Sequence, residues 1–344
     1  MKKNNLKKII ISLASILVIL VFIKSLMISI EVFKYNNKSE QIWSIGIYEG
    51  DDILNLKDKK DIVNPIITAN DVTDISAKFV ADPFLINDGQ KNYLFFEVLD
   101  NSMSKGVIGL ATSDDLNNWT YDKVVLEEEF HLSYPYVFEY NNEFYMLPEG
   151  GNSGYLNLYK SKNFPYEWEK ISSLLRGNYP DASIFQYDDK WWILSTKREK
   201  NGGTHFDNLH LYYSDNLTEG WKEHIKSPII TNDASISRPA GKVLVDNNKI
   251  IRFAQKDEAR YGEGVSAFEI TKLTESEYEE KLIGEVVSGS GIKGSWNEGG
   301  MHQSDVHKNE DGKYIVVVDG DYTNKYNVIF KNYIYKIKRF IGLK

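Results

Sequence analysis

The sequence predicts an all-β fold, a five-bladed β-propeller preceded by a single N-terminal transmembrane helix. Three observations lead to this prediction. A strand–turn–strand unit recurs five times, tryptophans recur with the same spacing, and one long apolar run precedes the repeats. A repeat of roughly 50 residues that holds several short strands is typical of a propeller blade.

Each repeat opens with a short segment built on Pro or Asp, continues as an apolar strand, turns, and returns as a second apolar strand. The opening segments are residues 81–83, 133–135, 179–181, 237–239 and 303–305. Polar turns such as Asn87-Asp88-Gly89 separate the two strands, as expected for hairpins. We therefore predict five blades in one propeller domain over residues 43–322.

Two further patterns support the ring. Trp119, Trp168 and Trp221 follow one another at about the blade period. We interpret them as inter-blade packing, because an indole ring buries a large apolar area. The strand-like stretch at residues 43–48 is expected to complete the last blade and close the ring.

The N-terminus has the pattern of an exported or anchored protein. Residues 1–8 are predicted as a basic cytoplasmic stub, residues 9–30 as a transmembrane anchor or signal segment, and residues 31–42 as a linker. The apolar run approaches the length that spans a bilayer, and Lys24 can snorkel to an interface. Basic residues stay inside, so the expected location is the cell membrane, single-pass, with the C-terminal domain extracellular. A cleaved signal peptide and a buried helix of a cytosolic protein are the alternatives.

The C-terminal residues 323–344 form a basic tail with several aromatics. Such a tail can lie on an anionic membrane beside the anchor. The alternative is a last strand followed by a frayed basic end.

Composition excludes several classes of function. There are 41 basic and 49 acidic residues, a net charge of −8, which argues against a nucleic-acid partner. The absence of cysteine excludes disulfides, thiolate catalysis and a Cys-ligated zinc site. The sequence contains no Gly-x-Ser-x-Gly motif, so nothing in it supports acyl-transfer chemistry. No cofactor and no metal site are predicted.

The hairpins predict where polar side chains gather. Symmetry about each turn places the opening segment opposite the end of the second strand. The predicted pairs at one rim of the ring are Asp82 with Glu97, Tyr134 with Glu149, Asp181 with Lys197, Arg238 with Gln255, and Asp305 with Asp319.

This rim has the composition of a carbohydrate site. Paired carboxyl groups, one deprotonated and one protonated, are the apparatus of glycoside hydrolysis. Basic side chains beside them can hold an acidic substrate group or lower a carboxyl pKa. The aromatics expected to stack on sugars are Tyr134, Tyr136, Trp191, Trp192 and Trp296. For Asp82 and Asp181, turn or strand-start capping is the alternative role.

The chain resembles a known family in five segments: residues 81–84, 131–139, 146–149, 179–181 and 237–241. They look like the N-terminal domain of glucosamine inositolphosphorylceramide transferase and its stand-alone bacterial relatives. That domain is similar to the five-bladed propellers of the arabinanase and β-xylosidase clan, glycoside hydrolase family 43 among them. The resemblance spans roughly residues 43–321, and the His-Leu-Ser-Tyr-Pro run at residue 131 is its most specific part.

The resemblance implies roles for individual residues. Asp82 matches the base of the clan, and Asp181 matches the aspartate that tunes its pKa. The general-acid glutamate is expected at the fourth opening segment, where this chain has Arg238, and an arginine cannot donate a proton at neutral pH. Either the acid has moved, with Glu149 the best candidate ahead of Glu97 and Glu298, or the hydrolase chemistry is lost. His302 matches a histidine that the clan places over the axis.

The predicted catalytic residues are therefore Asp82, Asp181 and Glu149. The predicted substrate-binding residues are Glu97, Tyr134, Lys197, Arg238, Gln255, His302 and Asp305. The expected function is that of a membrane-anchored, outward-facing carbohydrate-active protein, glycoside hydrolase-like or related to glycosyl transfer, acting on a cell-surface glycan. The alternative is a non-catalytic glycan-binding propeller that assists surface polysaccharide synthesis. A separate glycosyltransferase is a further candidate partner, because in the plant relatives a transferase domain follows this one.

Overall fold

The computed structural model describes residues 41–151, 153–198, 207–246, 249–257, 260–309 and 311–323. One compact unit extends from Ile42 to Tyr322. Every regular element of the described residues is a strand, and no helix among them is long and apolar enough to cross a membrane. The predicted stub (1–8), membrane segment (9–30) and nearly all of the linker and basic tail lie outside the described residues.

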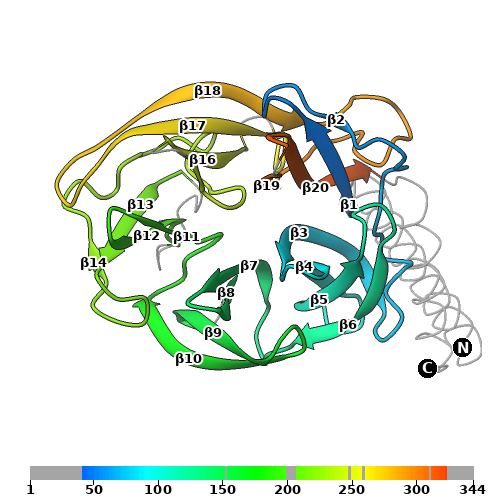
Figure 1. Cartoon of the computed structure of the whole chain (residues 1–344), viewed down its shortest axis with the longest axis horizontal. Helices are drawn as coiled ribbons and strands as arrows, with labels where there is room; N and C mark the ends of the chain where they lie inside the picture. The colour runs from blue at the N-terminus through cyan, green and yellow to red at the C-terminus, as the bar shows by residue number, and fades with distance from the viewer. Residues whose placement is uncertain are drawn as a thin grey trace, which may run out of the picture. The chain divides into compact units, whose positions relative to one another are not determined.

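The described strands form five four-stranded sheets arranged around one axis, as Figure 1 shows. The all-β, five-bladed propeller predicted from the sequence is therefore confirmed. Blade 1 contains β3 (Ala77–Asn87), β4 (Asn92–Asp100), β5 (Lys105–Ser113) and β6 (Thr120–Leu126). Blade 2 contains β7 (Ser133–Tyr140), β8 (Glu143–Glu149), β9 (Tyr155–Asn163) and β10 (Glu167–Arg176). Blade 3 contains β11 (Ser183–Tyr187), β12 (Lys190–Thr196), β13 (Leu209–Ser214) and β14 (Lys222–Glu223). Blade 4 contains β15 (Leu244–Asp246), β16 (Lys249–Lys256), β17 (Gly264–Leu273) and β18 (Tyr278–Ser288).

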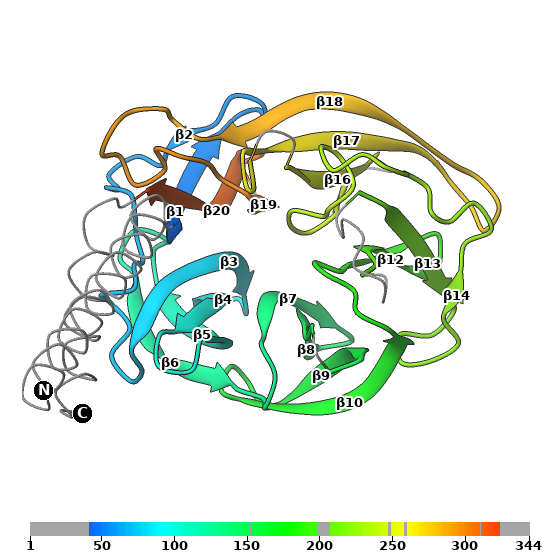
Figure 2. The ribbon, with the colours of Figure 1, turned by 180° about the vertical axis from the view of Figure 1, so that it is seen from behind.

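Blade 5 joins both ends of the unit. Its strand order is β19 (Ser304–Lys308), β20 (Tyr314–Thr323), β1 (Gln41–Gly50) and β2 (Lys57–Asp58). The expected closing strand at residues 43–48 is thus present as β1, and β2 adds a second N-terminal strand. Figure 2 shows from behind how β1 lies beside β20 and closes the ring.

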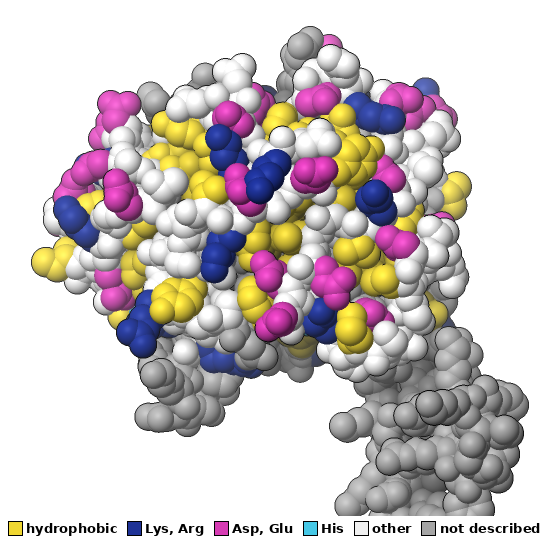
Figure 3. Space-filling model, turned by 90° about the horizontal axis from the view of Figure 1, so that it is seen from below, with side chains coloured by type: hydrophobic (Ala, Val, Ile, Leu, Met, Phe, Trp, Pro, Cys, Tyr) yellow, Lys and Arg dark blue, Asp and Glu magenta, His cyan; other side chains and the backbone are white. Residues whose placement is uncertain are grey.

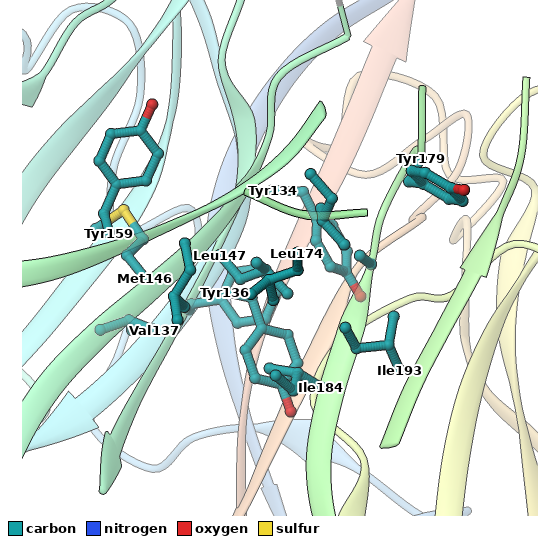
Figure 4. Close-up of a cluster of buried hydrophobic side chains, with 14 of the residues drawn as sticks. Tyr134, Tyr136, Val137, Met146, Leu147, Tyr159, Leu174, Tyr179, Ile184 and Ile193 are labelled. Atoms are coloured by element: carbon teal, nitrogen blue, oxygen red, sulfur yellow. The ribbon is translucent and has the colours of Figure 1, made fainter. Parts of the chain in front are cut away.

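The apolar faces of the sheets are buried between neighbouring blades. One cluster joins Phe84 of β3, Tyr136 of β7 and Ile184 of β11, so it binds three blades together. Figure 4 shows Tyr136, Val137, Met146, Ile184 and Ile193 within this cluster. Each such side chain stabilises the fold by about 1.5–3 kcal/mol when fully buried.

Of the three periodic tryptophans, Trp168 packs between two blades as the sequence predicted. The ring of Trp168 meets Phe95 of the neighbouring blade 1 edge to face, with 5.6 Å between ring centroids. Trp119 and Trp221 are partly buried against the core clusters on their side of the ring. Each indole N–H donates to a carbonyl in its own turn, at 3.3 Å for Trp119, 2.9 Å for Trp168 and 3.2 Å for Trp221.

The opening segments of blades 1, 2 and 3 share an unusual backbone. Asp82, Tyr134 and Asp181 have φ values of 53°, 47° and 49°, in the left-handed region that non-glycine residues seldom occupy. The ladders shift register at the first two of these residues, between Ala81 and Phe84 and between Ser133 and Tyr136. Strain of this kind, about 1–3 kcal/mol per residue, is concentrated at functional sites in known proteins.

The hairpin registers match the prediction in blade 4, differ from it by one residue in blades 1, 2 and 3, and differ by two residues in blade 5. Ala81 pairs with Glu97, Ser133 with Glu149, and the Gln255 amide donates to the Arg238 carbonyl. The predicted facing of Asp305 and Asp319 is wrong. Asp305 pairs with Val317, because the hairpin closes more tightly than expected, with the Asn309 amide donating to the Lys313 carbonyl.

In blade 3 the shift is one residue. Ser183 pairs with Leu194, and in this register Thr196, rather than Lys197, lies opposite Asp181. Because side chains alternate along a strand, a shift of one residue sends Lys197 to the other face.

Candidate functional site

Eight polar residues from all five blades are connected near the axis by ion pairs, hydrogen bonds or mutual charge effects. We call them the axial cluster: Asp82, Glu97, Glu149, Asp181, Arg238, Gln255, His302 and Asp319. All of them are buried except Glu149, which is partly exposed. Buried charges are retained in a fold only when they are paired, so the contacts within this cluster decide its properties.

His302 lies between two carboxylates. Its Nε2 is 3.3 Å from Oδ1 of Asp82, and its Nδ1 is 2.8 Å from Oδ2 of Asp319. Asp319 also accepts hydrogen bonds from the backbone N–H groups of His302 and Gln303, both at 3.0 Å, and from that of Asp82 at 3.0 Å. Asp319 therefore fixes the opening segments of blades 1 and 5 to each other.

This arrangement favours a charged histidine. Burial opposes the charge on His302, but attraction by Asp319 and by Asp82 outweighs it and raises the pKa of His302 to about 9. One ligand atom from each of Asp82, His302 and Asp319 lies within 4.8 Å of the others, which is close enough for a metal ion. Since both ring nitrogens of His302 already face a carboxylate, its imidazolium supplies the positive charge, and the three residues fit an ion-pair triad better than a metal centre.

Asp82 is poised to gain or lose a proton near neutral pH. Burial raises the pKa of Asp82 to about 7, with Asp181 and Asp319 adding to the rise and His302 and Arg238 opposing it. The carboxylate accepts one hydrogen bond, at 3.1 Å, from the backbone N–H of Tyr134 in blade 2. The left-handed backbone of Asp82 and Tyr134 brings these two groups together across the blade boundary.

Asp181 is neutralised by two side chains from blade 4. Its Oδ2 accepts a hydrogen bond from Nε of Arg238 and another, at 2.6 Å, from Nε2 of Gln255. Burial opposes the charge of Arg238, but the neighbouring Asp181 dominates and raises the pKa of Arg238 well above its ordinary value. The guanidinium is thus an internal counter-ion of Asp181.

Glu149 is the carboxyl group that this environment keeps protonated. Burial and repulsion by Asp181 raise the pKa of Glu149 to about 8, against the attraction of Arg238. The Glu149 and Asp181 carboxyl groups also share a side-chain hydrogen bond, which requires a proton on one of them. At neutral pH that proton belongs to Glu149.

Glu97 makes a contact that the sequence did not reveal. Its Oε1 is 3.4 Å from Nε2 of His131, and burial followed by repulsion from Asp82 raises the pKa of Glu97 well above its usual value. Nδ1 of His131 accepts a hydrogen bond of 2.9 Å from the Gly106 amide. Neutral His131 therefore carries its proton on Nε2, toward Glu97. Burial lowers the pKa of His131, which favours this neutral form.

The remaining predicted residues lie apart from the cluster. The Tyr134 ring is in the core, where Figure 4 shows it beside Tyr136; its hydroxyl accepts from the Gly241 amide at 2.7 Å and contacts Ser183 at 2.9 Å. Asp305 accepts from the Leu85 amide at 2.7 Å and contacts His307 at 2.8 Å and Lys242 at 3.4 Å. Lys197 is partly exposed beyond the end of β12.

Of the five aromatics expected to stack on sugars, four are in the core, and the fifth, Trp296, is partly buried beside Tyr48, with 6.5 Å between the ring centroids. The rings of Tyr134, Tyr136, Trp191 and Trp192 are all buried in the core. Tyr261, which the sequence did not single out, instead lies against Arg238 and His302 and is 38% exposed. Its only signal in the sequence is its position a few residues after the second strand of blade 4.

On the face drawn in Figure 3, the described Lys and Arg side chains are interspersed with Asp and Glu and form no continuous basic surface.

Comparison with known proteins places these observations in a family. The profile of the family described as glucosamine inositolphosphorylceramide transferase 1, N-terminal, matches residues 35–321. A protein named glucosamine inositolphosphorylceramide transferase 1 from Oryza sativa subsp. japonica is 33% identical over 299 residues, which are 82% of this chain and 40% of that protein. A protein of the same name from Arabidopsis thaliana is 33% identical over 300 residues, 82% of this chain and 39% of that protein. The chain thus spans well under half the length of these relatives.

Solved structures share the fold at low identity. A putative glycoside hydrolase from Parabacteroides distasonis has a TM-score of 0.57 and 12% identity, covering 76% of this chain and 95% of that one. A xylan β-1,4-xylosidase from Bacillus halodurans has a TM-score of 0.55 and 13% identity, and the match covers 76% of this chain and 54% of that one. An exo-1,5-α-L-arabinanase from a bovine ruminal metagenomic library has a TM-score of 0.50 and 17% identity, and the match covers 74% of this chain and 91% of that one.

The fold and the family that the opening segments suggested are therefore both confirmed. The chain belongs to the family of the N-terminal domain of glucosamine inositolphosphorylceramide transferase 1.

Proposed function

We propose that this chain is a carbohydrate-active propeller that cleaves or transfers a glycosidic bond of a cell-surface glycan. One observation carries the proposal: the carboxyl groups of Asp82 and Glu149 both belong to the axial cluster, both interact with the charge of Asp181, and both have pKa values that burial raises into the neutral range. Carboxyl groups whose environments separate their protonation are the means by which glycosidases assign an acid and a base. The solved structures of similar fold include proteins named as glycosidases.

In this proposal Glu149 is the general acid and gives its proton to the oxygen of the leaving sugar. Asp82 is the base or nucleophile and, as a base, takes a proton from the water or hydroxyl that attacks the anomeric carbon. Asp181 does not react; its charge keeps the proton on Glu149, and Arg238 and Gln255 hold Asp181 in place. The imidazolium of His302 keeps part of Asp82 deprotonated at neutral pH.

The charge of the axial cluster supports an amino sugar as the substrate more than an acidic sugar. The two cations of the cluster are already paired, Arg238 with Asp181 and His302 with Asp82 and Asp319, and the remaining carboxyl groups, Glu97 and Glu149, supply oxygens that can accept hydrogen bonds from an amine. Arg238 is already committed to Asp181, so little positive charge is left for an anionic group. The names of the plant relatives refer to glucosamine, which carries an amine.

The second candidate is glycan recognition without catalysis. The observation that favours it is Arg238, which stands where related hydrolases are expected to have their acid. In this alternative the same cluster holds a surface polysaccharide for a separate glycosyltransferase. Membrane attachment through residues 9–30, with the propeller outside the cell, is part of both proposals.

The test uses the full chain in detergent and a panel of bacterial surface polysaccharides, including polymers with free amines. Wild type, Asp82→Asn and Asp114→Asn are compared for retention of glycan and release of product. Asp114 is an exposed aspartate of blade 1 and serves as the matched control. Product from wild type and Asp114→Asn, with none from Asp82→Asn, supports the enzyme. Equal retention by all three without product supports recognition alone, and no retention by wild type would refute both.

A further inference from the structure

Tyr261 is the partly exposed aromatic ring beside the axial cluster. It follows β16 in blade 4 and is 38% exposed, whereas Arg238 and His302 beneath it are buried. The guanidinium of Arg238 lies over the face of the ring, 5.3 Å from its centroid. One face of Tyr261 is therefore turned toward the cluster.

Two further rings hold Tyr261 in this orientation. The Trp43 ring meets it at 86° with centroids 6.1 Å apart, and the His302 ring meets it at 62° with centroids 5.2 Å apart. Trp43 itself packs against His302, with the two rings tilted by 35° and their centroids 4.1 Å apart. Because Arg238 lies over one face of the ring, the face opposite Arg238 is the one that a ligand would approach.

The backbone next to Tyr261 is adapted to this packing. Gly262 has a φ of 70°, and a Cβ atom there would come within 2.6 Å of the Trp43 ring and 3.2 Å of His302. A larger residue at position 262 would push Tyr261 away from the cluster. The orientation of the ring is thus fixed before any ligand arrives, which lowers the entropic cost of binding.

We propose that the outward face of Tyr261 is a stacking platform for a sugar ring, directly above the carboxyl groups of the axial cluster. This inference rests on the proposed carbohydrate function and narrows its substrate class. A flat aromatic face selects pyranose sugars that present an unbroken apolar C–H face, such as those with the gluco configuration. The cluster beneath then contacts the polar edge of the same sugar.

The experiment compares Tyr261→Phe, which keeps the flat face, with Tyr261→Leu, which keeps apolar bulk and loses it. Tyr166→Leu is the matched control, because Tyr166 is 41% exposed and also has a cation, Lys123, 5.6 Å from its ring centroid. The full chain is tested in detergent against the polysaccharide panel named above and against glucosamine oligomers, with affinity and thermal melting measured for each variant.

We expect Tyr261→Leu to bind the retained glycan roughly tenfold more weakly. Tyr261→Phe and Tyr166→Leu should stay within about twofold of wild type, and all three variants should melt near the wild-type temperature. Undiminished binding by Tyr261→Leu, with binding by wild type intact, would overturn the platform and leave the proposed function standing. Equal losses in Tyr261→Phe and Tyr261→Leu would also overturn it, since the hydroxyl rather than the face would then matter. If wild type retains no glycan at all, the proposed function fails and the platform fails with it.

Discussion

The side chains of the axial cluster differ in charge because they differ in neighbours, although they have similar burial. Asp181 accepts hydrogen bonds from the Arg238 guanidinium and the Gln255 amide, whereas Glu149 lies beside the carboxyl group of Asp181. Glu97 faces His131, whose pKa is lowered by burial. Burial and repulsion therefore raise the pKa values of Glu97 and Glu149, whereas Asp181 and Asp319 are ion-paired with Arg238 and His302.

This distribution predicts a pH profile for turnover. Activity requires Asp82 without its proton and Glu149 with its proton, so it should rise as pH increases through about 7 and fall as pH increases through about 8. Glu149→Gln should lower turnover by about 10²–10⁴-fold and remove the alkaline limb. The measurement is kcat/KM from pH 5 to 10 for both proteins. An unchanged alkaline limb in Glu149→Gln would assign the acid to another group.

The histidine of the ion-pair triad predicts a pH dependence of stability. Its pKa is raised from an ordinary 6.5 to about 9 on folding, so the folded state binds the proton more tightly than the unfolded state. The resulting stabilisation is complete below pH 6.5 and is lost as pH rises through about 9. Thermal melting of wild type and His302→Asn across this range should show a gap of several degrees at pH 6 that narrows by pH 10. A gap that widens with pH would contradict the triad.

The residue contacts of the site were only partly accessible to sequence reasoning. The repeat predicted that four residues lie close together, because they occupy equivalent positions near the ends of the hairpins: Asp82, Glu149, Asp181 and His302. The contact of Glu97 with His131 depends on Gly106, where a Cβ atom would approach the Leu132 carbonyl to 2.2 Å and Glu97 to 2.8 Å. Such close approach between a strand and a neighbouring loop leaves no periodic signal in the sequence.

At the scale of the elements, the segments that precede the inner strands hold the blades together. The Tyr134 hydroxyl of blade 2 meets Ser183 of blade 3 and both backbone groups of Gly241 in blade 4. The Ser183 hydroxyl donates to the same Gly241 carbonyl at 2.8 Å. Three blades thus share one buried hydrogen-bonding centre beside the axis.

Gly241 permits this centre and predicts a large effect of substitution. It has a φ of 135°, and a Cβ atom there would come within 2.0 Å of the Ser304 carbonyl oxygen. Gly241→Ala should therefore lower the free energy of unfolding by about 3 kcal/mol or more, by forcing blades 4 and 5 apart. Gly312→Ala is the control, because Gly312 also has a positive φ, 82°, with no atom within 4 Å of the added Cβ. Equal losses in the two variants, measured by chemical denaturation, would show that backbone strain alone is responsible.

The hydroxyl of Tyr134 can be tested separately. Tyr134→Phe keeps the ring packed on Phe84, with centroids 4.8 Å apart, but leaves Gly241 and Ser183 without their shared partner. We expect a loss of about 1–3 kcal/mol in the free energy of unfolding, since buried polar groups become unsatisfied. Turnover per folded molecule should change little, because the ring is in the core rather than at the substrate. A large change in KM would instead indicate that Tyr134 contacts the ligand.

The elements themselves were the most predictable level. Alternating apolar residues and polar turns define each hairpin, and hairpin symmetry predicted the facing of Glu97, Glu149 and Gln255 with their partner strands to within one residue. The symmetry failed where a turn closed early, as it did beside Asp305. Register depends on the hydrogen bonds of a single turn, and the sequence of that turn permits more than one closure.

At the scale of the whole molecule, the ring is closed by strands from the two ends of the described chain. β1 also contains Trp43, whose ring packs against the ring of His302 in the site. Removal of residues 41–58 should therefore abolish the cooperative unfolding transition and the glycan binding together. Calorimetry of the shortened chain checks the first effect and the polysaccharide panel checks the second. A chain that lacks these residues and still melts cooperatively would mean that blade 5 is stable with two strands.

The closed ring also has a consequence for the timing of biosynthesis. Asp82 is made early and Asp319 late, and the axial cluster is incomplete until the ribosome has passed both. The first blades can collapse as they emerge, but β1 must wait for β20 before it has a neighbour on that side. A nascent or prematurely terminated chain would thus hold unpaired buried charges, and the chemistry of the site would begin only when synthesis is finished.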